Sequence, residues 1–109
     1  MNIHRVSQIL LLGLSASLTG PALAEGDPNA GREKAFTCLG CHGVPGYDNV
    51  YPSYKVPMLG GQHAKYLVSA LQAYKDGQRK HATMQAQAAT MSEQDMKDIA
   101  AYFATYGAK

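Results

Sequence analysis

The chain has 109 residues, with 10 lysine and arginine residues against 8 aspartate and glutamate residues. When Arg5 in the N-terminal segment is set aside, nine cations remain, and this balance is too close to neutral for a nucleic-acid-binding protein. The length allows one domain. A domain of this size has a thin hydrophobic core, which a bound cofactor would help to complete.

The first 24 residues have the pattern of a secretory signal. Arg5 provides a short basic start, residues 9–18 are mostly apolar, and Ala22-Leu23-Ala24 is a cleavage site of small residues. The apolar run is too short to span a bilayer unaided, although an uncleaved anchor is the alternative. We expect export, cleavage after Ala24, and a mature domain of residues 25–109 with no membrane span.

A helix is predicted to begin at Asp27-Pro28, with the aspartate as N-cap and the proline at the first helical position. We expect this helix to continue into the pentapeptide Cys38-Leu39-Gly40-Cys41-His42. Its cysteines lie about one helical turn apart, so both thiols can reach the two vinyl groups on one edge of a haem. The histidine that follows can bring its imidazole under the iron. C-x-x-C-H is the attachment signature of c-type haem, and its single occurrence implies one haem.

Two other interpretations of the C-x-x-C pair compete with haem attachment. A thioredoxin-like redox couple is one, but that motif belongs to a βαβ setting, and no strand pattern surrounds the cysteines. Half of a zinc site is the other, but zinc needs a second cluster of ligands. Only His63 and His81 remain in residues 25–109, each alone in the sequence.

Residues 43–61 contain four glycines, three prolines and three tyrosines among nineteen residues, and predict an ordered loop rather than a helix or a strand. A helix is predicted over residues 63–76, ended by Gly77 and carrying an apolar stripe of Leu67, Leu71 and Tyr74. Residues 78–90 show no strong periodicity.

The last helix has the clearest start in the chain. Ser92 is the predicted N-cap, Asp95 at the third helical position completes a variant of the capping box, and Met91 and Met96 can form a hydrophobic staple. Gly107 is expected to end the helix. Its predicted buried face consists of Met96, Ile99, Ala100 and Phe103. Three main helices without a convincing strand predict an all-α domain.

With these features the chain resembles the class I c-type cytochromes, most closely the small periplasmic monohaem proteins of bacteria. The resemblance implies an all-α cytochrome c fold, in which three main helices and an ordered loop wrap around one covalently attached haem. It also implies that the first and last helices cross, with Gly31 against Tyr102 or Phe103. The match covers nearly all of residues 25–109. It rests on Cys38-Leu-Gly-Cys-His-Gly43, Pro57-Met-Leu-Gly-Gly-Gln62, Tyr66-Leu67, Gly77-Gln-Arg79, Met84, Ser92-Glu-Gln-Asp95 and Ala100-Ala-Tyr-Phe103.

The resemblance implies that His42 is one axial ligand of the iron and that a methionine thioether is the other. A thioether is a soft donor that raises the reduction potential. Met58 lies in a segment that resembles the family's proline loop, where the Pro57 carbonyl receives the His42 Nδ1–H and Leu59 packs on the ring. Met84 lies where the family places its ligand and is therefore favoured, because gap filling explains Met58.

Other residues are candidates for contacts around the haem. Pro45 and Pro52 are alternatives to Pro57 as the partner that orients His42. Arg79 is favoured for the haem propionates, because a guanidinium binds a carboxylate through two parallel hydrogen bonds. His63 and His81 are expected at the surface, without a ligand role. The full set of propionate candidates is Tyr47, Tyr51, Tyr54, Gln62 and Arg79, each equally open to a packing or surface role.

If both axial positions are filled by the protein, the iron has no open site and can only change its oxidation state. We therefore predict a periplasmic single-electron carrier with a His/Met-ligated haem c, which is not an enzyme and docks transiently, as a monomer, with redox proteins. The alternative is a dedicated haem subunit of a periplasmic dehydrogenase complex. A ligand-binding haem sensor or a peroxidase, with Met84 loosely bound, is less favoured.

Charge is unevenly distributed along residues 25–109. Residues 55–81 carry five cations against one anion, Asp76, whereas acidic residues outnumber basic ones from Met84 to the end. This pattern predicts a basic rim around the exposed haem edge that meets an acidic patch on the partner. The alternative is that these are solvated helix charges without a docking role. The five cations are Lys55, Lys65, Lys75, Arg79 and Lys80.

Overall fold

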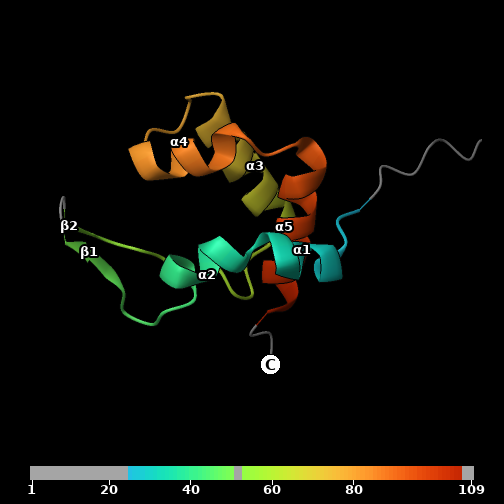
Figure 1. Cartoon of the computed structure of the whole chain (residues 1–109), viewed down its shortest axis with the longest axis horizontal. Helices are drawn as coiled ribbons and strands as arrows, with labels where there is room; N and C mark the ends of the chain where they lie inside the picture. Colours follow the sequence, from blue (N-terminus) through green and yellow to red (C-terminus); the bar gives the residue numbers. More distant parts are fainter. Residues whose placement is uncertain (1–24, 51–52, 107–109) are drawn as a thin grey trace, which may run out of the picture.

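The computed structural model describes residues 25–50 and 53–106. The predicted signal segment, Tyr51, Pro52 and Gly107 lie outside these residues. The described part contains five helices and one two-stranded sheet (Figure 1). No helix within it is long and apolar enough to cross a membrane. The elements are α1 (Pro28–Lys34), α2 (Phe36–His42), β1 (Asp48–Val50), β2 (Ser53–Lys55), α3 (Ala64–Lys75), α4 (Ala82–Ala89) and α5 (Glu93–Thr105).

Helix α1 begins as its sequence predicts. The Asp27 carboxylate accepts a hydrogen bond of 2.9 Å from the Asn29 backbone N–H, and Pro28 occupies the first turn. The predicted continuation into the C-x-x-C-H motif is interrupted at Ala35, where ψ is close to 0°. Helix α2 starts directly after Ala35, so the motif is helical but belongs to a separate short helix.

The first and last helices cross with their backbones in direct contact at Gly31. A β-carbon added to Gly31 would lie 1.9 Å from the Asp98 carbonyl oxygen and 2.9 Å from the Tyr102 Cβ. Any side chain larger than hydrogen would therefore push the two helices apart. The predicted contact between Gly31 and Tyr102 is confirmed, whereas Phe103 turns into the core and is fully buried.

A buried carboxylate also holds the two helices together. Asp98 on α5 is only 3 % exposed and accepts hydrogen bonds of 2.8 Å from the Asp27 backbone N–H and of 2.8 Å from Gln94 Nε2. Lys34 Nζ on α1 lies 2.6 Å from Asp98 Oδ2 and 2.8 Å from Asp95 Oδ1. The hydrogen bond from Lys34 is the main cause that lowers the pKa of Asp98 to about 2, so the carboxylate is ionised at neutral pH.

Helix α3 follows the prediction closely. It spans Ala64–Lys75, with His63 and Asp76 as its flanking caps. Gly77 has a positive φ of 75°, the left-handed conformation that a glycine adopts just beyond a helix end. Within the predicted stripe, Leu67 is buried, and Leu71 and Tyr74 are half-buried.

Helix α5 has the predicted capping box. Ser92 Oγ accepts a 3.0 Å hydrogen bond from the Asp95 backbone N–H, and Asp95 Oδ2 accepts one of 2.9 Å from the Ser92 N–H. The helix ends at Thr105, and Tyr106 is its C-cap. All four residues of the predicted inner face are buried, namely Met96, Ile99, Ala100 and Phe103.

Two parts of the fold differ from the sequence-based prediction. Residues 78–90, for which the sequence predicted no helix, contain α4, which begins after His81 as its N-cap. Residues 43–61, expected to form only a loop, contain an antiparallel hairpin of β1 and β2. The strands pair Asp48 with Lys55 and Val50 with Ser53, so each strand is three residues long.

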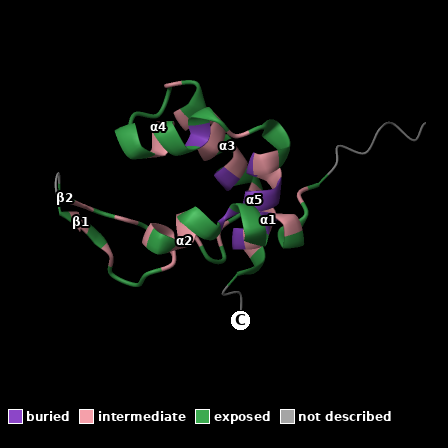
Figure 2. Ribbon diagram, viewed as in Figure 1, coloured by how far each residue is buried: buried purple, intermediate pink, exposed green. Residues whose placement is uncertain are grey.

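The hydrophobic core lies between α3, α5 and the junction of α1 with α2. Figure 2 shows the buried residues gathered along these helices, while the hairpin is exposed or only half-buried. The core is small, as expected for a chain of this length. Its central cluster consists of Ala35, Leu67, Ile99, Ala100 and Phe103.

We predict that Gly31→Ala destabilises the fold. Overpacking a close contact costs roughly 1–3 kcal/mol, which exceeds the gain of about 1 kcal/mol from replacing glycine within a helix. Gly40→Ala in α2 is the matched control, because no atom lies within 4 Å of its added Cβ. Chemical denaturation of the haem-containing protein should give a lower free energy of unfolding for Gly31→Ala only. Equal stability of the two variants would contradict the close approach.

Candidate functional site

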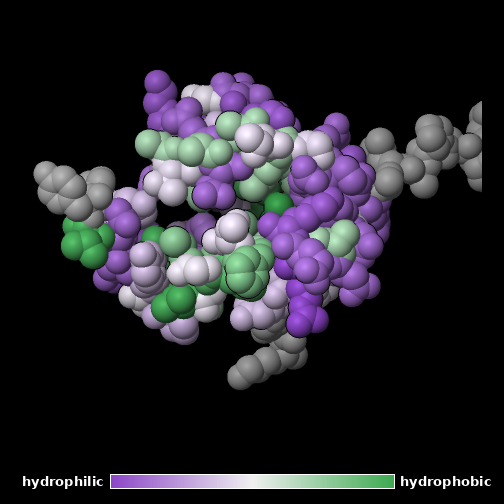
Figure 3. All heavy atoms as spheres, in the orientation of Figure 1, coloured by the Kyte–Doolittle hydropathy of each residue, from purple (hydrophilic) through white to green (hydrophobic). Residues whose placement is uncertain are grey.

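A cavity of about 590 Å³ opens between the core helices and the segments around α2 and α4. This volume lies within the range of cofactor sites, which are about 300–1,000 Å³. Figure 3 shows the surface hollowed on this face of the molecule. The side chains predicted to contact haem all line the cavity: Cys38, Cys41, His42, Pro57, Leu59, Gln62, Arg79 and Met84.

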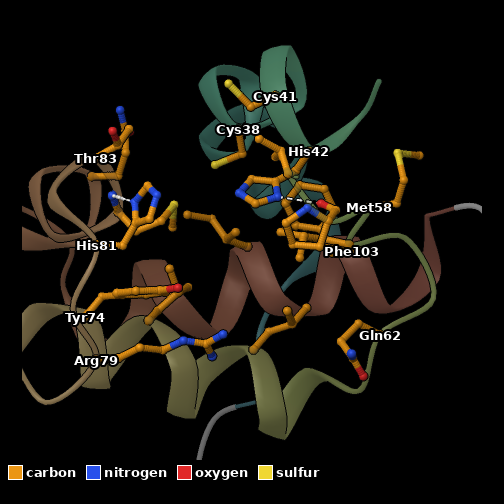
Figure 4. A pocket seen from close by; sticks show the side chains of 18 of the residues that line it. Cys38, Cys41, His42, Met58, Gln62, Tyr74, Arg79, His81, Thr83 and Phe103 are labelled. Carbon is orange, nitrogen blue, oxygen red and sulfur yellow. Dashed lines mark hydrogen bonds between the residues drawn. The ribbon is translucent and has the colours of Figure 1, made fainter. Parts of the chain in front are cut away.

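Helix α2 brings the two thiols and the imidazole to one side of the cavity (Figure 4). Cys38 and Cys41 are half-buried and form no disulfide. Burial is the largest effect on Cys38 and raises the pKa of its thiol. A thioredoxin-like couple needs a thiol with a lowered pKa, so this environment does not fit the redox interpretation. Among the described residues, no group of three histidine, cysteine or acidic side chains is arranged to hold a metal ion.

The imidazole of His42 is oriented by the loop that follows the hairpin. Its Nδ1 donates a 2.7 Å hydrogen bond to the carbonyl oxygen of Pro57, the partner predicted from the sequence. Pro45 does not line the cavity, and Pro52 lies outside the described residues. Because the carbonyl can only accept, Nδ1 carries the proton and Nε2 keeps its lone pair for a metal.

Two methionines that were weighed as the second ligand occupy different places. Met84 is half-buried on α4 and lines the cavity. Met58 follows Pro57, is 46 % exposed and also lines the cavity, with its thioether directed away from His42 in Figure 4. Met84 is thus the more buried of the two.

The cavity has an apolar floor and a polar margin. Its floor is formed by Leu59, Leu67, Leu71, Ile99 and Phe103. At the margin, Arg79 Nη1 donates a 3.2 Å hydrogen bond to the Tyr66 hydroxyl, and the guanidinium carbon lies 5.0 Å from the centre of the Tyr74 ring. Gln62 Oε1 accepts a 2.9 Å hydrogen bond from the backbone N–H of His63.

Other propionate candidates are divided by the structure. Tyr54 lines the cavity, whereas Tyr47 does not, and Tyr51 lies outside the described residues. Tyr66, which was not among the candidates, lines the cavity and partners Arg79. The sequence gave no sign of the contact between Tyr66 and Arg79. Tyr66 lies next to Leu67 in α3, and its contact with Arg79 depends on the path of the turn between α3 and α4.

His81, which was expected at the surface without a ligand role, is less exposed than predicted. His81 is half-buried, lines the cavity and accepts a hydrogen bond of 3.3 Å at Nδ1 from the Met84 backbone N–H. Its ring meets Tyr54 edge-on, with 4.6 Å between centroids. His63 is exposed, as predicted. Histidine is not among the preferred N-cap residues, so His81 did not mark the start of a helix. The only sequence signal for α4 was the set of helix-forming alanines that follow His81.

These donors suit a haem bound through thioethers. Two thiols and an imidazole with a free Nε2 come from one short helix, a thioether comes from another, and apolar side chains line the space between them. The fold is helical, and the C-x-x-C-H motif lines its cavity. Together these features define a small c-type haem protein.

The comparisons with known proteins agree with this class. A model of the cytochrome c family matches residues 29–106, so the chain belongs to the cytochrome c family. Membership implies a covalently attached haem c. The predicted relation to class I cytochromes and the cytochrome c fold are thereby confirmed.

Individual relatives show how much of each protein is matched. Cytochrome c4 of Pseudomonas aeruginosa is 43 % identical over 105 residues, which are 96 % of this chain and 49 % of that protein. Cytochrome c-554(548) of Halomonas halodenitrificans is 46 % identical over 83 residues, 73 % of this chain and 96 % of that protein. The chain thus spans about half the length of the cytochrome c4 relative.

Solved structures show the same architecture. Cytochrome c4 from Pseudomonas stutzeri superimposes with a TM-score of 0.58 and 28 % identity, over 78 % of this chain and 52 % of that one. A thiosulfate dehydrogenase from Marichromatium purpuratum has a TM-score of 0.63 and 32 % identity, over 81 % of this chain and 21 % of that one.

We predict that haem stays with the polypeptide during acid–acetone extraction, because thioether bonds survive conditions that release non-covalent haem. A variant carrying both Cys38→Ser and Cys41→Ser should lose all of its colour to the organic layer. Absorbance of the two phases measures the outcome. Haem from the unmodified protein in the organic layer would contradict covalent attachment.

Proposed function

We propose that this protein is a periplasmic single-electron carrier in which His42 and Met84 would hold the iron of haem c. The observation that carries the proposal is the Pro57-oriented imidazole of His42 on one side of an apolar cavity that Met84 also lines. When bound, haem c supplies an iron that changes between its ferrous and ferric states. Cys38 and Cys41 would hold it through thioethers.

The side chains around the cavity suit electron transfer rather than catalysis. His42 is held in one tautomer by Pro57, so its Nε2 is available without reorganisation. If Met84 supplied the second ligand, no coordination site would remain for a substrate, and the protein would not be an enzyme. The apolar floor would bury one part of the haem, and burial of this kind helps to set the reduction potential. Arg79 and Gln62 at the margin are the groups that we assign to the propionates.

Export through the N-terminal signal, with cleavage after Ala24, would place this chemistry in the periplasm. There the protein would meet its donor and acceptor proteins transiently, as a monomer. The likeness to a thiosulfate dehydrogenase supports a second candidate, a haem subunit held permanently by a dehydrogenase. Purification from the native host separates the two, because a subunit would stay with its enzyme through size-exclusion chromatography.

We predict that Met84→Ala abolishes the weak near-infrared absorption band of thioether-ligated ferric haem, because the sulfur donor is lost. Imidazole should then bind the vacated position at least tenfold more tightly, a change of about 1.4 kcal/mol. Met58→Ala is the matched control, since Met58 is the more exposed of the two methionines. Absorption spectra and imidazole titrations measure both effects.

The same experiment tests the less favoured class of function. If Met58→Ala loses the band and Met84→Ala keeps it, the wrong methionine has been assigned. If the unmodified reduced protein binds carbon monoxide readily at neutral pH, the sixth position is open, and a ligand-binding sensor or peroxidase replaces the electron carrier.

The charges support docking at the cavity side. Lys55 and Arg79 line the cavity, whereas α5 contributes Ile99 and Phe103 to its floor. The acidic residues of α5 are largely neutralised within the fold, since Asp95 and Asp98 pair with Lys34 and Glu93 pairs with Lys97. In the described residues, no salt bridge involves the five cations of residues 55–81. Lys75 donates a hydrogen bond to the Met91 carbonyl oxygen, and Arg79 is assigned to the propionates. Lys55, Lys65 and Lys80 are therefore the cations that we expect to attract an acidic partner.

We predict that oxidation of the reduced protein by the anion hexacyanoferrate(III) slows about tenfold between 0.01 and 0.1 M salt. The Debye length falls from about 30 to about 10 Å across this range, which removes long-range attraction. A variant with Lys55→Gln and Lys80→Gln should show a dependence nearer threefold. Stopped-flow absorbance measures the rates.

The matched control for this test carries Arg32→Gln and Lys97→Gln, which remove the same charge from residues outside the predicted basic rim. Its salt dependence should equal that of the unmodified protein. A rate indifferent to salt in the unmodified protein would rule out electrostatic attraction by the basic rim and leave apolar contact to direct docking.

A further inference from the structure

Helix α4, which carries Met84, has little support from the rest of the fold. Among the described helices and strands it packs against α3 alone, and the β1–β2 hairpin packs against no helix. Both elements lie at the same end of the molecule in Figure 1, with α4 above and the hairpin below. An eight-residue helix is marginal on its own, so contacts at its first turn decide where Met84 lies.

His81 supplies two such contacts from one side chain. Its Nδ1 accepts the hydrogen bond from the Met84 backbone N–H, which caps the first turn of α4. That turn contains no acidic residue, so the imidazole provides its side-chain acceptor. The same ring makes a T-shaped contact with the ring of Tyr54 on β2. The interplanar angle is 87° and the centroids are 4.6 Å apart. Figure 4 shows His81 on the wall that faces Cys38 and His42 across the cavity.

We propose that His81 is a positioning residue for Met84, holding the first turn of α4 while its contact with Tyr54 keeps the hairpin and α4 together. A methionine side chain has three rotatable bonds, so its backbone must be fixed if the thioether is to stay on a metal. The inference rests on the proposed ligation by Met84. In this proposal His81 acts on the iron only by positioning Met84, and His81 itself does not contact the iron.

Three substitutions separate the two contacts of His81. His81→Asn keeps a side-chain acceptor at the N-cap and removes the ring, whereas His81→Phe keeps the ring and removes the acceptor. His81→Ala removes both. His63→Ala is the matched control, because His63 holds the equivalent N-cap position of α3, is exposed and makes no side-chain cap hydrogen bond.

The measurement is the affinity of the ferric protein for imidazole, which competes with the thioether, together with the amplitude of the near-infrared band. Loss of the cap in His81→Phe should tighten imidazole binding about fivefold. Loss of the ring contact in His81→Asn should tighten it about threefold. His81→Ala should exceed tenfold with a weaker band, and His63→Ala should match the unmodified protein.

A second pair of variants tests the link to the hairpin. Tyr54→Ala removes the ring contact from the other side and should resemble His81→Asn. A double variant with Tyr54→Ala and His81→Asn should bind imidazole no more tightly than either single variant, because both substitutions remove the same contact. Should His81→Ala fail to take up haem, the Asn, Phe and Tyr54 variants still give the answer.

The outcomes distinguish this inference from the proposed ligation. If Met84→Ala keeps the near-infrared band, ligation by Met84 is wrong and the role of His81 falls with it. If Met84→Ala loses the band while every His81 variant binds imidazole like His63→Ala, only the positioning role is overturned. A lower free energy of unfolding with unchanged imidazole affinity would likewise overturn it, because His81 would then be structural alone.

Discussion

The close approach of α1 and α5 at Gly31 is the constraint on which the cavity depends. Helix α1 leads directly into the short helix that holds the C-x-x-C-H motif, and α5 contributes Ile99 and Phe103 to the cavity floor. Their separation therefore sets the distance from the thiols to the apolar floor. The ion pair of Lys34 with the buried Asp98 fixes the same crossing by charge, so the motif is held by steric fit and electrostatics together.

Beyond the crossing, the cavity is assembled from parts with unequal support. The core side rests on α3 and α5, whose buried residues pack together. The opposite side consists of α4 and the hairpin, which meet through the rings of His81 and Tyr54. A haem bound between them would add apolar contact to both sides at once, in keeping with a core that is small without it. The chain encloses a cavity that its own side chains do not fill, and the donor residues line this cavity. A bound haem would account for both features.

Features that depend on near neighbours could be predicted from the sequence. The Asp27 cap, the capping box of Ser92 and the left-handed Gly77 each involve groups only a few residues apart. The orientation of His42 by Pro57 needed the family resemblance, because fifteen residues separate the two. Helix α4 and the three-residue strands escaped prediction because neither shows a hydrophobic period. The contact of His81 with Tyr54 could not be predicted for a related reason, because a contact between two rings far apart in the sequence leaves no local pattern.

The hydrogen bond between Asp27 and Asp98 joins positions 71 residues apart and so turns most of the described chain into a closed ring. The entropy of closing such a ring grows only with the logarithm of its length, so ten added residues would cost about 0.1 kcal/mol. Insertions into the ring's exposed segments, such as residues 44–46, are therefore nearly free in chain entropy. The loop between α2 and the hairpin can thus change in length while the crossing that closes the ring stays unchanged.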